Sequence, residues 1–209
     1  MERRMTPSGA IRIETRADGG KTLVGYGAVF YREGEAGTEY RLGPDVVERI
    51  SPSAFTRALA EKHDARALFN HDPNMLLGRA AAGTLRLSTD ARGLRYEIDL
   101  PDTNVGKDVA ASIARGDLSG SSFSFAINGK DGQPFEKCKE YDVRHIEDVD
   151  LYDVGPVTYP AYEATSVGLR SGDCSDAFEA VNDWRKEREA EAVAVRLRQI
   201  LVDSETAIA

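Results

Sequence analysis

Alternating hydrophobic and polar positions predict that most of the chain consists of short β-strands. Residues 11–15 and 22–30 alternate with a period of two, and the turn-forming residues 17–20 between them predict a β-hairpin. The same period, or a short hydrophobic run, predicts further strands at residues 46–50, 65–69, 84–88, 94–100, 122–127 and 143–159. Many short strands with even turn spacing favour a β-barrel or a β-sandwich.

The strand predicted at residues 122–127 has two chemically different faces. Phe123 and Phe125 alternate with Ser122 and Ser124, so the phenylalanines and the serines point to opposite sides of the strand. We expect the aromatic face to lie in the core, and the hydroxyl face to line a groove or the surface.

Two short helices are predicted between the strands. Ser51 and Pro52 have the chemistry of a helix N-cap and a first helical position, which predicts a helix that ends near residue 61. Residues 107–115 carry an apolar stripe at helical spacing, and Gly116 follows as a favourable C-cap.

The last part of the chain changes from strand-like to helical periodicity. Residues 176–201 place apolar side chains at the spacing of an amphipathic helix that is rich in Arg, Glu and Ala. We therefore expect residues 1–170 to form a β-barrel body and residues 171–209 to form a helical appendage. The expected fold class is mainly β with peripheral helices, followed by a C-terminal amphipathic helix.

Composition and charge exclude several classes of protein. The chain has 209 residues, of which 41% are hydrophobic, and a formal net charge of −8. An ordinary globular fold is expected, without the positive field that attracts nucleic acid. Cys138 and Cys174 are too few for a disulfide framework, which indicates a reducing compartment. There is no apolar run of about 18 residues, so neither a membrane span nor a signal peptide is expected.

Histidine chemistry has three candidates, His63, His71 and His145. His71 follows a predicted buried strand and stands among turn-forming residues, where a turn can aim its imidazole at a partner. The alternative is an ordinary polar loop residue. His71, Asp72 and His145 lack the short-spaced ligand pair of a zinc site, so no metal is expected.

A serine and an aspartate complete the candidate chemistry. Ser122 lies close to Gly120, where free backbone N–H groups could stabilise the oxyanion that forms when a serine attacks a carbonyl. Serine and glycine at a strand edge are also ordinary turn residues. Asp153 is expected to share the apolar face of its strand with Leu151, so its carboxylate either has a partner, such as a catalytic histidine, or reaches solvent.

Several short motifs follow one another in order between residues 23 and 167. They are Gly25-Tyr26-Gly27-Ala28-Val29-Phe30, Ile50-Ser51-Pro52-Ser53-Ala54-Phe55, Asn70-His71-Asp72, Gly116-Asp117-Leu118-Ser119-Gly120-Ser121-Ser122-Phe123-Ser124-Phe125 and Leu151-Tyr152-Asp153-Val154-Gly155-Pro156-Val157-Thr158-Tyr159-Pro160-Ala161. Each motif is loose by itself. Their order and spacing resemble the serine-type prohead proteases of tailed bacteriophages, which mature capsids.

This resemblance implies a fold related to the herpesvirus assemblin proteases, a compact β-barrel with peripheral helices. It implies a serine endopeptidase that cuts the major capsid protein and scaffold segments inside the prohead, in the host cytoplasm. By position in the motifs, His71 matches the family's histidine, Ser122 its serine and Asp153 its third member. In that mechanism Ser122 attacks, His71 carries the proton, Asp153 orients His71, and no metal or organic cofactor is needed.

Two assignments within the implied triad stay open. The family's third position is commonly glutamate, and aspartate is one methylene shorter, so it must come closer to the imidazole. His145 is the alternative to Asp153, because the related viral proteases use a second histidine after the serine. Ser121 and Ser124 are the alternatives to Ser122.

Other functions and partners also follow from the sequence. A non-enzymatic capsid assembly factor would bind coat or scaffold protein but would not need His71 and Ser122 together, and an unrelated β-barrel binding module would not need the ordered motifs. The C-terminal helix either tethers the enzyme to scaffold and is removed by self-cleavage, or packs permanently on the barrel. A homodimer stays open, and neither nucleic acid nor a membrane is an expected partner.

Overall fold

The computed structural model describes residues 1–6, 11–159 and 175–208. The chain divides into two compact units, Met1–Cys174 and Ser175–Ala209. The boundary expected after residue 170 lies outside the described residues. Each unit is described by itself below.

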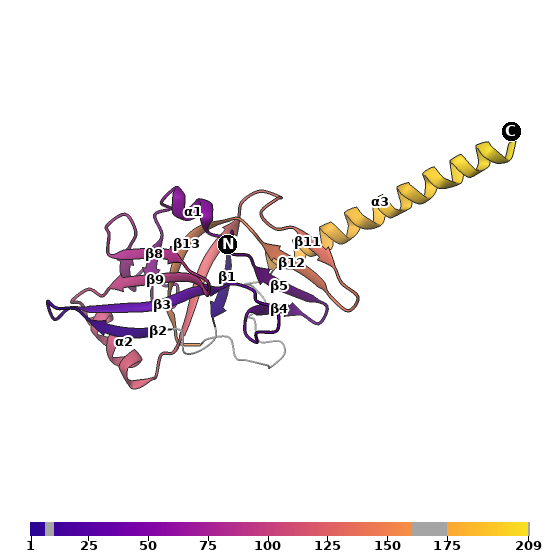
Figure 1. Cartoon of the computed structure of the whole chain (residues 1–209). Helices are drawn as coiled ribbons and strands as arrows, with labels where there is room; N and C mark the ends of the chain where they lie inside the picture. The colour runs from indigo at the N-terminus through magenta and orange to yellow at the C-terminus, as the bar shows by residue number, and fades with distance from the viewer. Residues whose placement is uncertain (7–10, 160–174, 209) are drawn as a thin grey trace. The chain divides into compact units, whose positions relative to one another are not determined.

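The first unit is built from three β-sheets (Figure 1). The largest contains, in spatial order, β1 (Glu2–Thr6), β10 (Gly120–Ile127), β13 (Val149–Val157), β6 (Arg66–Leu68) and β7 (Leu76–Arg79). A second contains β11 (Phe135–Lys137), β12 (Asp142–Ile146), β5 (Val46–Ile50) and β4 (Glu39–Gly43). The third contains β2 (Ile11–Thr15), β3 (Lys21–Val29), β9 (Gly93–Asp99) and β8 (Leu85–Thr89). The mainly-β prediction is confirmed, although the described strands form three sheets rather than one closed barrel.

The predicted strands are present, although β1, β4, β7 and β11 were not predicted and one predicted strand is divided where the chain changes sheet. The predicted hairpin is present as the antiparallel pair β2 and β3. The strand predicted at residues 143–159 is in fact two strands, β12 and β13, in different sheets. The break occurs because the backbone N–H groups of Glu147 and Asp148 both donate to the carbonyl of Gly132, in the loop before β11. A hydrophobic pattern does not reveal such a change of partner.

The helices are α1 (Thr56–Ala60), α2 (Asn104–Arg115) and α3 (Ser175–Ile208). The prediction that Ser51 caps the first helix is wrong, because the backbone N–H of Ser51 instead donates to Ile146 and continues the sheet. The hydroxyl of Thr103 caps α2, and Gly116 ends it with a positive φ of 85°, as expected for a C-cap glycine.

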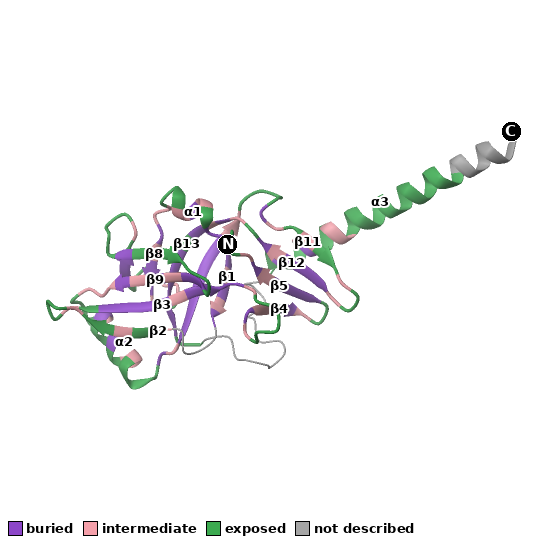
Figure 2. Ribbon diagram, in the orientation of Figure 1, coloured by how far each residue is buried: buried purple, intermediate pink, exposed green. Residues whose placement is uncertain are grey.

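The core of the first unit lies between the sheets (Figure 2), where buried residues follow the central strands. A row of aromatic rings runs through it, with centroid distances of 6.3 Å from Phe30 to Phe55, 5.5 Å from Phe55 to Phe123 and 5.0 Å from Phe123 to Phe125. The aromatic face of β10 therefore lies in the core, as predicted, and fixes the orientation of that strand.

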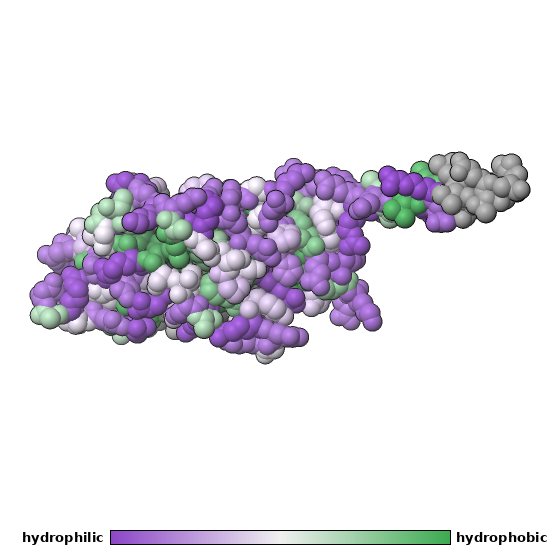
Figure 3. All heavy atoms as spheres, turned by 45° about the horizontal axis from the view of Figure 1, so that its top comes forward, coloured by the Kyte–Doolittle hydropathy of each residue, from purple (hydrophilic) through white to green (hydrophobic). Residues whose placement is uncertain are grey.

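The second unit consists of α3, so the predicted C-terminal helix is confirmed. Helical spacing places Val193, Leu197 and Ile200 along one side and Val195 on the other, and all four are exposed. Hydrophobic side chains accordingly show beside charged ones on this helix (Figure 3). No helix in the described part of the chain is long and apolar enough to cross a membrane.

Candidate active site

Strand β10 carries the three candidate serines, Ser121, Ser122 and Ser124, and buries all of them completely. The prediction that its hydroxyl face lines a groove or the surface is therefore wrong. Ser122 is the third residue of β10, and the strand pairs with β1 along one edge and with β13 along the other. Ladder pairing on both edges also occupies backbone groups that the sequence led us to expect free near Ser122.

His71 stands in a tight turn between β6 and β7. Both Asn70 and His71 have positive φ values, 56° and 57°. The left-handed region is sparsely populated by residues other than glycine, although asparagine and histidine enter it more readily than most. Two consecutive residues in this region bend the chain sharply, and this bend places the His71 imidazole against β10 and β13.

The side chain of Asn70 holds this turn against the end of β13. Its Oδ1 accepts from the backbone N–H of Thr158 at 2.8 Å, and its Nδ2 donates to the Thr158 hydroxyl at 2.9 Å. The backbone N–H of Asn70 also donates to Pro156 at 3.1 Å. Sequence analysis missed this residue as a positioning group, because a turn asparagine is ordinarily explained by its backbone conformation alone.

Asp153 comes from β13, and a β-bulge decides which way it points. Phe125 pairs with Leu151, but the next residue of β10, Ser124, pairs with Asp153, so Tyr152 is an extra residue in the strand. Directly paired residues share a face, and Asp153 therefore joins the serine face while Leu151 joins the phenylalanine face. The prediction that Asp153 and Leu151 share a face is wrong for this reason.

The three side chains form a continuous hydrogen-bonded chain. Ser122 Oγ lies 2.7 Å from His71 Nε2, and His71 Nδ1 lies 2.5 Å from Asp153 Oδ1. The other carboxylate oxygen of Asp153 accepts from the hydroxyl of Ser124. The side chains of His71 and Asp153 are each only 8% exposed, so these bonds are shielded from water. In this order, the imidazole can act as a base toward the serine hydroxyl, and the carboxylate can orient the imidazole, which is the arrangement that activates a serine nucleophile.

Of the alternatives to this set, Ser124 lies in the same network through its bond to Asp153, and the others lie elsewhere. His145 is on β12 and its Nε2 lies 3.2 Å from Glu136. His63 contacts Glu61 at 3.0 Å. The hydroxyl of Ser121 points to the other face of β10 and contacts Tyr96 and the carbonyl of Gly155. Among the residues that the structure describes, no group of three or more His, Cys, Asp or Glu side chains is arranged to hold a metal ion.

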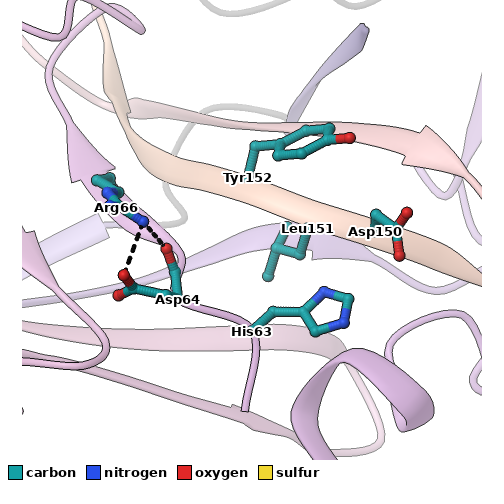
Figure 4. A pocket seen from close by; sticks show the side chains of 6 residues that line it. All are labelled: His63, Asp64, Arg66, Asp150, Leu151 and Tyr152. Atoms are coloured by element: carbon teal, nitrogen blue, oxygen red, sulfur yellow. Dashed lines mark hydrogen bonds and ion pairs between the residues drawn. The ribbon is translucent and has the colours of Figure 1, made fainter. Parts of the chain in front are cut away.

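Two further acidic residues close to Asp153 in sequence belong to a separate ion-pair network. Arg57 donates to Asp148 at 3.0 Å and to Asp150 at 2.6 Å, at the start of β13. A hollow beside this network is lined by His63, Asp64, Arg66, Asp150, Leu151 and Tyr152 (Figure 4). None of the three triad side chains lines it, so this hollow is not an entrance to Ser122.

A buried charge cluster that the sequence analysis missed includes two residues of β1, the strand that pairs with β10 beside Ser122. Arg4 on β1 binds Glu48 on β5 through Nε at 2.5 Å and Nη2 at 2.8 Å. Arg144 on β12 binds Glu48 at 2.6 Å and Glu2 at 2.7 Å. Burial alone would raise the pKa of Glu48, but Arg4 and Arg144 outweigh it and hold the pKa below its usual value. The two cations and two anions neutralise each other.

Comparison with known proteins supplies the family. The model of the caudovirus prohead serine proteases matches residues 10–197, which is most of the chain. The chain belongs to this family. The resemblance stated from the sequence is therefore confirmed. The matched range of the prohead protease family contains His71, Ser122 and Asp153 and begins after β1.

Among solved structures, the chain is similar to the bacteriophage T4 capsid assembly protease. The two are 11% identical, the similarity covers 77% of this chain and 100% of that chain, and the TM-score is 0.49. No curated protein matches the chain.

Proposed function

We propose that this member of the prohead protease family is a serine endopeptidase in which Ser122, His71 and Asp153 form the catalytic triad. The observation that carries the proposal is the hydrogen-bonded chain from Ser122 Oγ through both nitrogens of His71 to Asp153, with spacings of 2.7 and 2.5 Å. A nucleophile needs a base within hydrogen-bond reach, and the base needs a group that orients it. Residues from three separate segments meet both conditions.

The proposed reaction is acyl transfer. Ser122 Oγ attacks the scissile carbonyl carbon while His71 Nε2 takes the hydroxyl proton, and the carbon–nitrogen bond then breaks as His71 protonates the leaving amine. Water hydrolyses the resulting ester, again with His71 as base, and the proton returns to Ser122. Asp153 accepts from Nδ1–H throughout, which keeps Nε2 available and stabilises the imidazolium. Oxyanion stabilisation is assigned to backbone N–H groups beside Ser122, which the strand ladder occupies in this structure, so it requires their release.

The proposed substrates are the major capsid protein and scaffold segments, cut within the prohead in the host cytoplasm. Family membership supports this choice of substrate. Self-cleavage is part of the proposal, with the segment 171–209 as an appendage that tethers the enzyme to scaffold and is then removed.

The test is co-expression with the coat protein encoded beside this chain. Cleavage of the coat protein and of the chain itself is followed by intact mass, for the natural sequence and for Ser122→Ala. We expect cleavage to disappear in Ser122→Ala while circular dichroism and the unfolding midpoint stay close to those of the natural sequence. Ser121→Ala is the matched control, because it removes the neighbouring hydroxyl from the other face of β10 and should still cleave.

Other results would contradict parts of the proposal. Unchanged cleavage by Ser122→Ala would move the nucleophile to another serine, with Ser124 the first candidate. Binding of coat protein without cleavage by any variant would favour a non-enzymatic assembly factor. The tether is tested by deleting residues 171–209. If the segment is a tether, the shortened enzyme should keep its peptidase activity but enter fewer particles, and loss of activity with a folded body would contradict this role.

A further inference from the structure

The edge of β10 that carries Ser122 is covered by β1. The two strands are antiparallel, with Arg4 opposite Phe123 and Met5 opposite Ser122. Among the described strands, β1 stands at the end of its sheet and pairs there with β10 alone. A protease that binds an extended peptide against the strand of its nucleophile needs this edge free.

The nucleophile itself is bound to β1. Ser122 Oγ donates to the carbonyl oxygen of Arg4 at 2.9 Å, although His71 Nε2 is also within 2.7 Å. A hydroxyl has one proton, so when Arg4 accepts it the proton is not shared with His71. The Arg4 carbonyl turns its oxygen rather than its carbon toward Ser122, which is a geometry for holding the serine and not for cleaving the Arg4–Met5 bond.

The side chains that hold β1 in place are polar. Its buried residues are Glu2, Arg4 and Thr6, and β1 supplies no member of the hydrophobic core. Two charge pairs anchor it: Arg4 binds Glu48, and Glu2 binds Arg144. If β1 leaves, Glu48 and Arg144 keep each other as partners at 2.6 Å, so no uncompensated charge is stranded in the interior.

We propose that the β10 edge under β1 is the peptide-binding groove of the enzyme, and that β1 is its built-in occupant. This inference rests on the proposed function. A substrate segment replaces β1, pairs antiparallel with β10 and frees the Ser122 proton for His71. The departure of β1 also releases the backbone groups of β10 that it occupies, which are then available to the substrate and the oxyanion.

The anchors of β1 define the chemistry of the segment that replaces it. Glu48 binds the basic residue of β1, Arg4, and would bind a basic side chain at the same position of a substrate. Arg144 binds Glu2 and would bind an acidic side chain two residues earlier in that substrate. The guanidinium of Arg4 also lies 5.4 Å from the centre of the Phe125 ring, which favours a flat cation at that position. The groove is therefore expected to prefer extended segments with an acidic residue two positions before an arginine.

The first test measures how readily Ser122 reacts in full-length chains. A fluorophosphonate probe, which phosphonylates an activated serine and releases fluoride, is applied to the natural sequence and to Arg4→Met. Loss of the charge-assisted anchor should raise the rate of labelling at Ser122 by about tenfold or more. Arg3→Met is the matched control, because it removes the same charge from the neighbouring residue, and its rate should equal that of the natural sequence.

The second test follows hydrogen exchange in a chain whose β1 sequence is unaltered, in the variant Ser122→Ala, whose unfolding midpoint is checked in the test of the proposed function. Ser122→Ala is incubated with a synthetic acetylated peptide of residues 1–6, and hydrogen exchange is followed by mass spectrometry. The peptide should speed exchange in the chain's own β1 while β10 stays protected, and the same peptide with Arg4→Ala should do so much less. It should also slow fluorophosphonate labelling of Arg4→Met.

The outcomes separate the two proposals. If Ser122 is labelled equally fast in the natural sequence, Arg3→Met and Arg4→Met, and the peptide does not change exchange in β1, then β1 does not occupy the groove and the triad stands. If Ser122 stays unlabelled in Arg4→Met although hydrogen exchange shows that β1 is released, then Ser122 is not an activated nucleophile and the proposed function fails.

Discussion

Two buried polar clusters lie on either side of the contact between β1 and β10, and they are built differently. In the cluster of Glu2, Arg4, Glu48 and Arg144, each charge has an opposite charge within 2.8 Å. In the triad, the carboxylate of Asp153 contacts the imidazole of His71 and the hydroxyl of Ser124 instead of an arginine.

The difference separates anchoring from proton transfer. A carboxylate held by two guanidinium groups stays ionised and gains nothing from moving a proton, so the charge cluster is suited to holding strands together. The interaction between a carboxylate and an imidazole becomes stronger when the imidazole is protonated. The reaction of a serine nucleophile creates this protonated state. Burial strengthens both clusters because water screens neither of them.

The largest expected effect tests the triad side of this comparison. Asp153→Asn removes the acceptor charge at His71 Nδ1 and favours the wrong tautomer, so kcat should fall by about 10⁴-fold. The measurement is steady-state cleavage of a coat-derived peptide. Asp150→Asn on the same strand is the control and should keep its activity, because Asp150 binds Arg57. Equal losses in both variants would show that kcat reports the stability of β13 and not the triad.

The next effect tests the anchoring side. Glu48→Gln leaves Arg4 and Arg144 buried with too little negative charge, and the free energy of unfolding should fall by about 3–5 kcal/mol. Urea unfolding at neutral pH measures it. Glu39→Gln breaks the half-exposed pair with Arg49 and should cost at most about 1 kcal/mol. If Glu48→Gln and Glu39→Gln lower the free energy of unfolding by the same small amount, the charge cluster does not stabilise the fold.

A smaller effect distinguishes two neighbouring serines. Ser124→Ala removes the hydrogen bond to the second oxygen of Asp153, and we expect kcat to fall by about tenfold with KM unchanged, since a hydrogen bond to a charged group contributes about 1.5–3 kcal/mol. Ser121→Ala loses its contacts with Tyr96 and Gly155 and should lower stability by about 1 kcal/mol with kcat unchanged. Similar kcat values for the two variants would exclude a positioning role for Ser124.

The smallest effect is a dependence of stability on pH. The pKa of Glu48 is lowered in the folded state, so this residue stabilises the fold above its unfolded pKa, and the contribution is lost as the pH falls toward the folded pKa. The natural sequence should therefore lose unfolding free energy between neutral and acid pH more steeply than Glu48→Gln, by at most about 1.4 kcal/mol per pH unit. If the unfolding free energies of the natural sequence and Glu48→Gln fall equally steeply with pH, Glu48 does not contribute this pH dependence.

Several elements of the fold could be predicted because local pattern and tertiary contacts agree there. The hairpin of β2 and β3 has alternation and a glycine turn, and the phenylalanines of β10 bury the face that the pattern assigns to the core. Strand β1 was not predicted, because the charged residues Glu2, Arg3 and Arg4 ordinarily indicate a solvated segment. The burial of Glu2 and Arg4 depends on Arg144 and Glu48, which come from distant parts of the chain.

The candidate site also contains features that the sequence predicts and features that depend on contacts between distant segments. Ordered motifs pointed to His71, Ser122 and Asp153, and the structure brings these three side chains into one hydrogen-bonded chain, while their catalytic roles stay a prediction. The clamp formed by Asn70 and the face on which Asp153 lies could not be found from sequence. Both depend on how two strands pair, and a single strand's pattern carries no information on its partner's register.

The bulge in β13 makes the site depend on an irregularity in strand pairing. The side chain of Tyr152 is 44% exposed, so many substitutions there should be tolerated. Deleting Tyr152 would remove the bulge but leave Leu151 opposite Phe125 and Asp153 opposite Ser124, so Asp153 would keep its side of the strand. A strand that kept Tyr152 and paired without the bulge would instead carry Asp153 to the side of the phenylalanines. The side on which the carboxylate lies is therefore set by the pairing at position 152 and not by the chemistry of the residue found there.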